Sequence, residues 1–374
     1  MTPHATAFLL SGPRDAVDLV GGLATGLRAD GLPLDRVWLS NITVHPLLAA
    51  SGAVWTLERG VVARSVPFGA RGSIRLSRAL DDIAERLGHV RLSDHAPGAD
   101  RVGLPAALWE EGYAEVLATV FRDEGRPLAF FTFATRDAWR PRDVEALEAV
   151  RPTLALAARL VARTELAEVL ASTYLGPATA RRVLAGSIHR GDGERIPAAI
   201  WFSDLRGFTA LSETHPLDEV LRLLDDAFDV QVRCIEAEGG EVLKFMGDGL
   251  LAVFRGEPAV ACAAAVRASE RLADAVPVLN ARREGEGAPL MRYGLALHYG
   301  EVMYGNIGAP HRLDFTVIGP AVNLAARLEG LCAALGRVAL ASRAFADHVP
   351  LRWESLGSHP VKGLGVIEAL ARPS

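Results

Sequence analysis

The pattern of apolar and polar positions predicts alternating helices and strands in the N-terminal part of the chain. Apolar residues recur there at helical spacing in longer segments and gather in shorter, strand-like runs between them. The predicted elements are, in chain order, a helix over 14–31 that ends at Gly31, strands over 36–40 and 53–57, a helix over 76–87, strands over 113–121 and 128–135, and a long helix from about 140 to 170. A polar turn, Arg122-Asp-Glu-Gly-Arg-Pro, joins the last two strands into a predicted hairpin.

A different order of elements follows a short predicted helix over 178–185 and a polar loop over 186–195. Residues 196–202 form a near-continuous apolar run, which is typical of a strand buried on both faces. The other predicted elements are an amphipathic helix over 217–238, a hairpin over 241–254 that turns at 247–249, a largely helical segment over 260–279, strands over 290–299 and 301–304, and a helix over 321–334. Helices packed against such a sheet make an α+β domain.

These patterns, in a chain of 374 residues, predict two α+β domains rather than one. We expect an N-terminal domain over residues 1–165, a helical linker over 166–195 and a C-terminal domain over 196–374. The linker prediction rests on the long helix and on the Gly-rich polar loop that follows it.

Composition excludes several classes of function. The net charge of −5 argues against a broad basic surface for nucleic acid and against attraction to a membrane surface. The most apolar runs, over 154–162 and 259–266, are far shorter than the ~20 residues that a bilayer span needs. Three widely spaced cysteines form no disulfide framework, and the N-terminus lacks a signal-peptide pattern, so we expect a cytoplasmic protein.

The hairpin and the long helix of the N-terminal domain resemble the end of a GAF domain. The turn Asp-Glu-Gly-Arg-Pro-Leu lies between two strands, and a helix opens after an aromatic residue and a proline. The resemblance covers about residues 15–165 and implies a small antiparallel sensor domain, of a kind that often holds a ligand and often dimerises. Another α+β sensor domain with the same element order is the alternative. The residues do not identify the signal, which we leave as an unknown small molecule or protein.

Two aspartates of the C-terminal domain occupy positions suited to metal binding. Asp204 comes directly after the buried strand, and Asp248 lies in the predicted hairpin turn. Each alone is typical of a helix N-cap or a tight turn. Two strand-end aspartates can, however, converge on a hard divalent cation whose other ligands include substrate phosphates.

Three segments together resemble the signature blocks of class III adenylate/guanylate cyclases. They are Ile200-Trp-Phe-Ser-Asp-Leu-Arg-Gly-Phe-Thr, Lys244-Phe-Met-Gly-Asp-Gly, and Asp314-Phe-Thr-Val-Ile-Gly-Pro-Ala-Val-Asn-Leu-Ala-Ala-Arg-Leu-Glu. The resemblance covers about residues 195–372 and keeps the order of the family's blocks. It implies a palm-like, ferredoxin-type sheet with packed helices, and conversion of ATP to 3′,5′-cyclic AMP and pyrophosphate.

The resemblance also implies residue roles on the metal and phosphate side of the site. Asp204 and Asp248 would bind two Mg²⁺ or Mn²⁺ ions, with the backbone carbonyl of Leu205 as a further ligand. Backbone amides up to Gly207 and Phe208 would hold phosphates at a helix start.

Further residues match groups that act on the ribose and the phosphates. Asn323 and Arg327 stand four residues apart and so share one helix face. The asparagine would position the ribose, and the arginine would meet the charge that develops on the α-phosphate. Lys362 resembles the lysine that binds the triphosphate.

The residues expected to read the purine depart from the family's commonest pair. Lys244 matches the usual lysine, but Thr316 stands where most adenylate cyclases have aspartate. A threonine hydroxyl can accept from the adenine 6-amino group, and the glutamate that selects guanine is absent. This pair resembles the class IIIb subset, in which bicarbonate responsiveness is frequent. ATP is favoured as substrate, and guanylate cyclase activity stays open.

The family's active sites are shared between subunits, which implies a head-to-tail homodimer here because the chain has one cyclase domain. The N-terminal domain would then regulate catalysis through the helices over 144–185. A catalytically silent cyclase-like module is a further alternative, although the full set of aspartate, lysine, asparagine and arginine argues against it. A diguanylate cyclase lacks support, because its Gly-Gly-Asp/Glu-Glu-Phe hairpin is missing.

Overall fold

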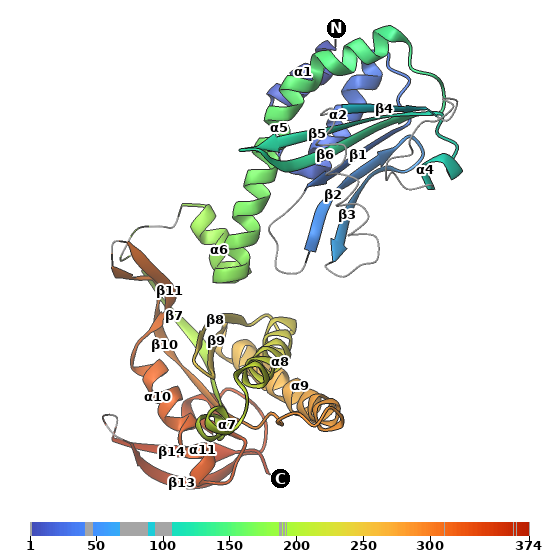
Figure 1. Ribbon diagram of the computed structural model, residues 1–374. Coiled ribbons are helices and arrows are strands. Elements are labelled where there is room, and N and C mark those ends of the chain that lie inside the picture. The colour runs from blue at the N-terminus through green and yellow to red at the C-terminus, as the bar shows by residue number, and fades with distance from the viewer. Residues whose placement is uncertain are drawn as a thin grey trace. The chain divides into compact units, whose positions relative to one another are not determined.

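The structure is a computed structural model that divides into two compact units, Met1–Thr173 and Tyr174–Ser374 (Figure 1). It describes residues 2–41, 48–67, 89–93, 107–186, 189, 191, 193–309, 311–361, 363 and 365–373. Helix α5 continues through residue 165, where the sequence predicted the N-terminal domain to end. Among the described residues, no helix is both long enough and apolar enough to cross a membrane.

The first unit is an α+β domain built on an antiparallel sheet with strand order β3-β2-β1-β6-β5-β4 over the described residues. Its strands are β1 (Arg36–Asn41), β2 (Leu48–Thr56), β3 (Gly60–Pro67), β4 (His89–Ser93), β5 (Glu115–Asp123) and β6 (Arg126–Thr135). Its helices are α1 (Pro3–Leu10), α2 (Ala16–Ala29), α4 (Ala107–Glu110) and α5 (Pro141–Leu175). The β5–β6 turn holds Glu124 and Gly125 at φ 48° and 80°, as a tight two-residue hairpin requires.

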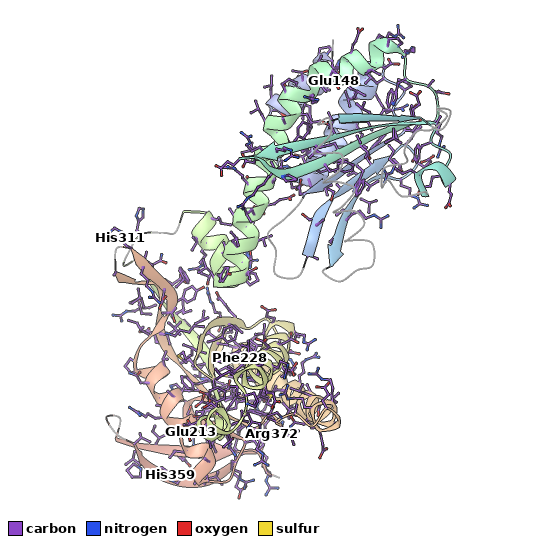
Figure 2. The ribbon with its side chains drawn as sticks, in the orientation of Figure 1. Glu148, Glu213, Phe228, His311, His359 and Arg372 are labelled. Carbon is purple, nitrogen blue, oxygen red and sulfur yellow. The ribbon has the colours of Figure 1, made fainter. Side chains whose placement is uncertain are left out.

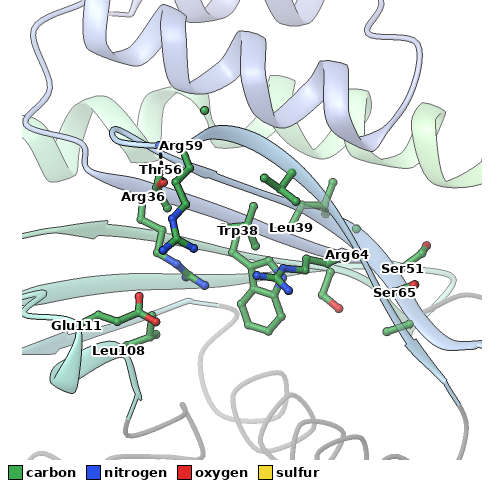
Figure 3. A pocket seen from close by; sticks show the side chains of 16 residues that line it. Arg36, Trp38, Leu39, Ser51, Thr56, Arg59, Arg64, Ser65, Leu108 and Glu111 are labelled. Carbon is green, nitrogen blue, oxygen red and sulfur yellow. Dashed lines mark hydrogen bonds between the residues drawn. The ribbon is translucent and has the colours of Figure 1, made fainter.

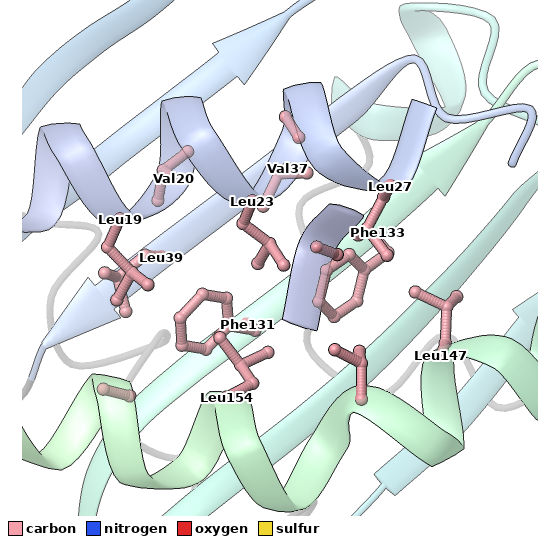
Figure 4. Packing of buried hydrophobic residues seen from close by; sticks show 14 of the residues in the cluster. Leu19, Val20, Leu23, Leu27, Val37, Leu39, Phe131, Phe133, Leu147 and Leu154 are labelled. Atoms are coloured by element: carbon pink, nitrogen blue, oxygen red, sulfur yellow. The ribbon is translucent and has the colours of Figure 1, made fainter. Parts of the chain in front are cut away.

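Helices α2 and α5 bury one face of this sheet (Figure 4). Helix α2 begins where the Asp15 carboxylate accepts from the Asp18 amide at 2.8 Å, and it is followed by Gly31 at φ 86°. Its buried leucines pack against Leu39 of β1 and against the phenylalanines of β6. Along β1 and its neighbouring strands, the residues that alternate with these core residues face the other side of the sheet.

The sequence predicted most of these elements, with ends shifted by a few residues. The helices at 14–31 and from 140, and the strands at 36–40, 53–57, 113–121 and 128–135, are confirmed. The predicted helix over 76–87 lies outside the described residues. Helix α1 and strand β3 were not predicted, since neither has a distinctive apolar period.

The second unit is also α+β, and its sheet follows the order β13-β14-β12-β10-β7-β9-β8, with β11 paired to β10. Its strands are β7 (Gly193–Leu205), β8 (Glu241–Met246), β9 (Gly249–Arg255), β10 (Tyr293–Ala309), β11 (Arg312–Ile318), β12 (Ala339–Ser342), β13 (Glu354–Val361) and β14 (Gly365–Ala371). Its helices are α6 (Pro177–Leu184), α7 (Phe208–Thr214), α8 (Leu217–Ala237), α9 (Pro258–Gly285), α10 (Pro320–Glu329), α11 (Leu331–Ala334) and α12 (Arg343–Ala346).

Strand β7 lies in the middle of the unit and is buried on both faces, as its apolar run predicted. Trp201 packs on the side covered by α8 and α9, and Ile200 packs on the side covered by α10; both are 0% exposed. This placement fixes the end of β7, and with it Asp204, within a rigid sheet.

Two predicted element boundaries are wrong. The two strands predicted over 290–299 and 301–304 are one strand, β10, which begins at Tyr293 and in which Gly300 pairs with Ala198. A Cβ on Gly300 would lie 2.8 Å from the Ala321 side chain, so this glycine admits helix α10 close to the sheet and makes no turn. The predicted helix over 321–334 is interrupted at Gly330, between α10 and α11.

Candidate active site

The two predicted metal-binding aspartates lie side by side. Asp204 is the penultimate residue of β7, and Asp248 lies in the turn between β8 and β9. The register pairs Ser203 with Leu250, which brings that turn to the end of β7. The two carboxyl groups are close enough that Asp248 raises the pKa of Asp204, through its charge and as a hydrogen-bond partner. Gly249 leaves the room for this approach, because a Cβ there would lie 3.2 Å from Asp204 Oδ1.

Burial, the neighbouring Asp248 and then Glu329 together raise the pKa of Asp204 to about 7. Two carboxylates at this separation repel each other unless a proton or a cation lies between them. Their hard oxygen donors are those that Mg²⁺ and Mn²⁺ prefer. The residues present therefore fit a divalent cation.

Sequence reasoning missed Glu329, the last residue of α10. Burial raises the pKa of Glu329. The guanidinium of Arg206 opposes this rise, and the charge of Asp248 adds to it. The Glu329 carboxylate fills the space above Gly294, whose absent Cβ would lie 2.1 Å from Oε1. Gly294 pairs with Asp204 across β7 and β10, so Glu329 adds negative charge next to the aspartate pair. Glu329 is the last residue of the third signature block, and its place in that block was its sequence signal.

A buried hydrogen-bond chain holds the end of β7 in place. Trp201 Nε1 donates to Ser203 Oγ at 3.2 Å, and Ser203 Oγ donates to Gln231 Oε1 at 2.6 Å. Gln231 on α8 in turn donates to the Ala227 carbonyl at 3.2 Å. The chain ties the residue before Asp204 to a neighbouring helix.

The predicted phosphate-binding turn follows directly. Leu205 ends β7, Gly207 is left-handed at φ 72°, and Phe208 begins α7. The Arg206 amide donates to the Arg292 carbonyl at 2.9 Å, so it is not available to a phosphate. The amides at the start of α7 have no partner inside their own helix. A Cβ on Gly207 would meet nothing within 4 Å, so the space above this turn is open.

A second group of predicted residues surrounds a pocket of 520 Å³. Lys244 of β8 and Asn323 of α10 both line it, together with Val317 and Ile318 of β11. Arg327 lies one helical turn beyond Asn323, and both side chains are exposed. Neither makes a hydrogen bond or ion pair within the described part of the chain. Asp204 and Asp248 are not among the residues that line this pocket.

Thr316 lies next to the pocket residue Val317 but is itself only 3% exposed. Its hydroxyl oxygen is buried and has no hydrogen-bond partner among the described residues. A buried hydroxyl without a partner is costly, and it is expected where a ligand supplies the missing bond. Lys362, the predicted triphosphate lysine, lies outside the described residues.

Strand β8, which carries the pocket residue Lys244, also contacts helix α6 of the predicted linker. Thr179 of α6 donates to Glu241 Oε1 at 3.1 Å, and Tyr304 of β10 donates to the same oxygen at 2.8 Å. Arg255 pairs with the other carboxylate oxygen and stacks 3.7 Å from the Tyr304 ring centroid. Tyr304 in turn meets Phe315, the neighbour of Thr316, with centroids 4.7 Å apart. Helix α6 is thus bonded to the first residue of β8, three positions before Lys244.

Comparison with known proteins agrees with this geometry. Residues 194–368 match the family model described as adenylate and guanylate cyclase catalytic domain. The chain is 31% identical over 170 residues to adenylate cyclase 1 of Rhizobium meliloti (strain 1021), covering 43% of this chain and 25% of that protein. It is 35% identical over 133 residues to an adenylate cyclase of Anabaena cylindrica, covering 35% of this chain and 26% of that one. The chain therefore spans about a quarter of the length of these relatives.

Among solved structures, a bacterial light-regulated adenylyl cyclase is similar with a TM-score of 0.52 and 23% identity, covering 69% of this chain and 85% of that one. At this identity the likeness concerns the fold alone. It confirms the α+β fold class and the cyclase-type sheet of the second unit.

Proposed function

We propose that residues 194–368, the class III cyclase catalytic domain of this chain, convert ATP to 3′,5′-cyclic AMP and pyrophosphate. The observation that carries the proposal is the convergence of Asp204 at the end of β7 with Asp248 in the β8–β9 turn, which the pairing of Ser203 with Leu250 brings together. In the reaction the ribose 3′-oxygen attacks the α-phosphorus, the bond to the β-phosphate oxygen breaks, and the hydroxyl proton goes to solvent. Bound divalent cations would supply Lewis-acid stabilisation of the 3′-oxygen and of the triphosphate.

The chain's own side chains have separate roles in this proposal. Lys244 donates to adenine N1, and the unpartnered Thr316 hydroxyl accepts from the 6-amino group. Asn323 orients the ribose from the wall of the same pocket. The planar guanidinium of Arg327 meets the charge that grows on the α-phosphate. Gly207 and Phe208 offer backbone amides to the phosphates.

A head-to-tail homodimer completes the site. The aspartate pair and the Lys244–Asn323 pocket form two half-sites, since the aspartates do not line that pocket. A partner would bring its aspartates to this chain's pocket and the reverse, giving two shared sites. Large apolar side chains stay exposed nearby and support an interface: Leu217 and Leu221 of α8, Phe245 of β8 and Ile318 of β11. Phe228, labelled in Figure 2, packs against Phe245 with ring centroids 4.3 Å apart and ring planes tilted by 35°.

The N-terminal unit regulates the enzyme in this proposal, as a GAF-like sensor that acts through α5 and α6. The support is the bonding of Thr179 to Glu241, which links α6 to the strand that carries Lys244. A change in the position of α6 would therefore reach the base-reading residues through Glu241 and Tyr304.

Turnover by the purified chain tests the activity. With Mg²⁺ or Mn²⁺, we expect cyclic AMP from ATP, at a higher rate than cyclic GMP from GTP. Asp204→Ala and Asp248→Ala should each lose more than a thousandfold, because metal-assisted catalysis supplies at least several kcal/mol. Asp274→Ala, which removes an exposed carboxylate of α9, is the matched control and should keep full activity. Activity within tenfold of wild type in either aspartate variant would contradict the metal assignment.

A further inference from the structure

The first unit carries a hollow on the face of its sheet opposite α2 and α5. Three cross-strand rows form its floor, set by the register of β1, β2 and β3. The rows are Arg36–Thr56–Gly60, Trp38–Val54–Val62 and Ser40–Gly52–Arg64. All nine residues line one pocket of 540 Å³.

The hollow exists because two positions in these rows have no side chain. Gly52 lies in the centre of its row, and Gly60 ends another. A Cβ on Gly52 would lie 1.9 Å from the Leu39 carbonyl oxygen, so no other residue fits there without moving the strand. A volume of this size holds a small organic molecule.

Three arginines converge on this hollow (Figure 3). Arg36 and Arg59 lie at one end, and Arg64 extends beside the ring of Trp38. None of the three makes an ion pair with a carboxylate of the described residues. The carboxylate among the lining residues is that of Glu111, on the side of Arg36.

The environment of Arg36 is unfavourable without a counter-ion. Burial lowers its pKa and so does Arg64, while Tyr113 and Glu111 act in the opposite direction. Its side chain has a long 3.4 Å bond to the Thr132 hydroxyl and stacks 5.7 Å from the Trp38 ring centroid. Burying a guanidinium without a charged partner is costly.

Two arginines of the same unit outside the hollow illustrate the usual arrangement, in which a carboxylate is the partner. Arg140 pairs with Asp143 at 2.7 Å, and Arg163 pairs with Asp123 at 2.6 Å. The hollow thus brings together three arginines that have no ion pair among the described residues, beside the half-buried Trp38 and apolar side chains such as Val54 and Val62.

We propose that this hollow binds a small organic anion, a carboxylate or phosphate attached to a flat, apolar body. Arg36 and Arg64 bind the anionic group, because planar guanidinium groups match its geometry. Trp38 and the valines contact the flat part. The inference concerns binding by the first unit and does not depend on the cyclase proposal.

Titration calorimetry on the full chain tests the inference with a matched pair of probes, 2-naphthoate and the neutral 2-naphthamide. We expect one naphthoate per chain, and at least tenfold weaker binding of the amide. Arg36→Gln and Arg64→Gln should each weaken naphthoate at least tenfold. Arg126→Gln removes an exposed arginine of the same unit outside the hollow and should leave the affinity unchanged. Unchanged thermal midpoints would show that the variants are folded.

Three outcomes would overturn the proposal. One is the absence of naphthoate binding, and another is equal affinity for acid and amide, which would mean that charge is not recognised. The third is wild-type affinity in folded Arg36→Gln and Arg64→Gln proteins, which would place any binding elsewhere. Because every readout is binding, a failure here leaves the cyclase proposal untouched, and a failure of turnover leaves this one untouched.

Discussion

The substitution Thr316→Val tests whether the Thr316 hydroxyl serves substrate binding or the stability of the fold. The Thr316 oxygen is buried and has no partner among the described residues, so the folded protein gains nothing from it. Replacing it by a methyl group of similar shape should leave the free energy of unfolding unchanged or raise it by up to about 1 kcal/mol. Most polar-to-apolar substitutions that break a hydrogen bond at a buried position would instead lower the free energy of unfolding.

The same change should impair catalysis. If the hydroxyl accepts from the adenine amino group, its loss leaves that group unpaired in a buried pocket at a cost of about 1–3 kcal/mol. This corresponds to a fall in kcat/KM for ATP of about 5- to 150-fold. Chromatographic measurement of cyclic AMP gives kcat/KM, and urea unfolding of the same samples gives the stability.

Thr316→Ser is the matched control, because it keeps the hydroxyl and loses the methyl group. It should destabilise by about 0.8 kcal/mol for the lost buried carbon and keep kcat/KM within about threefold. Thr316→Val should therefore lower kcat/KM without loss of stability, whereas Thr316→Ser should lower stability with little loss of kcat/KM. A Thr316→Val enzyme with kcat/KM for ATP within twofold of wild type, or with stability lowered by more than 1 kcal/mol, would refute the reasoning.

Three other predictions follow from the site. Lys244→Glu combined with Thr316→Cys should reduce the preference for ATP over GTP at least tenfold in competition assays, and an unchanged preference would mean that other residues read the base. Thr179→Val and Glu241→Gln should each lower kcat/KM for ATP several-fold while leaving metal affinity unchanged, because they loosen β8 near Lys244; wild-type kinetics would remove α6 from the account. Mg²⁺ or Mn²⁺ should raise the thermal midpoint of the wild type by binding the folded state, and Asp248→Ala should lose that shift; an equal shift in both proteins would place the cation elsewhere.

Local patterns predicted the elements whose signal is complete within the segment. The apolar run at 196–202 predicted a strand buried on both faces, and Ile200 and Trp201 are both fully buried. Gly300 misled the prediction because a glycine in a strand can mark a turn or a close approach. Only the position of Ala321, which the fold brings next to Gly300, shows that this glycine marks a close approach.

Contacts between residues far apart along the chain could not be predicted from the sequence. The motif blocks predicted roles for the aspartates, the lysine and the asparagine. They could not predict the contact between Thr179 and Glu241, which are 62 residues apart in the sequence. Nor could they reveal that the Thr316 hydroxyl lacks a partner. The gathering of Arg36 and Arg64 over one hollow depends on the register of three strands, which alternation alone does not fix.

The most direct test of the central claim, a cyclase site shared between two chains, is mixing of complementary variants. Asp204→Ala lacks the metal half of the site, and Arg327→Ala lacks the phosphate-charge half. Each should be nearly inactive when assayed alone. After mixing under conditions that allow subunit exchange, some dimers have one site with both defects and one with neither. Cyclic AMP formation should therefore reappear, at well below the wild-type rate. If exchange is demonstrated by differently tagged chains and no activity returns, the shared site is contradicted.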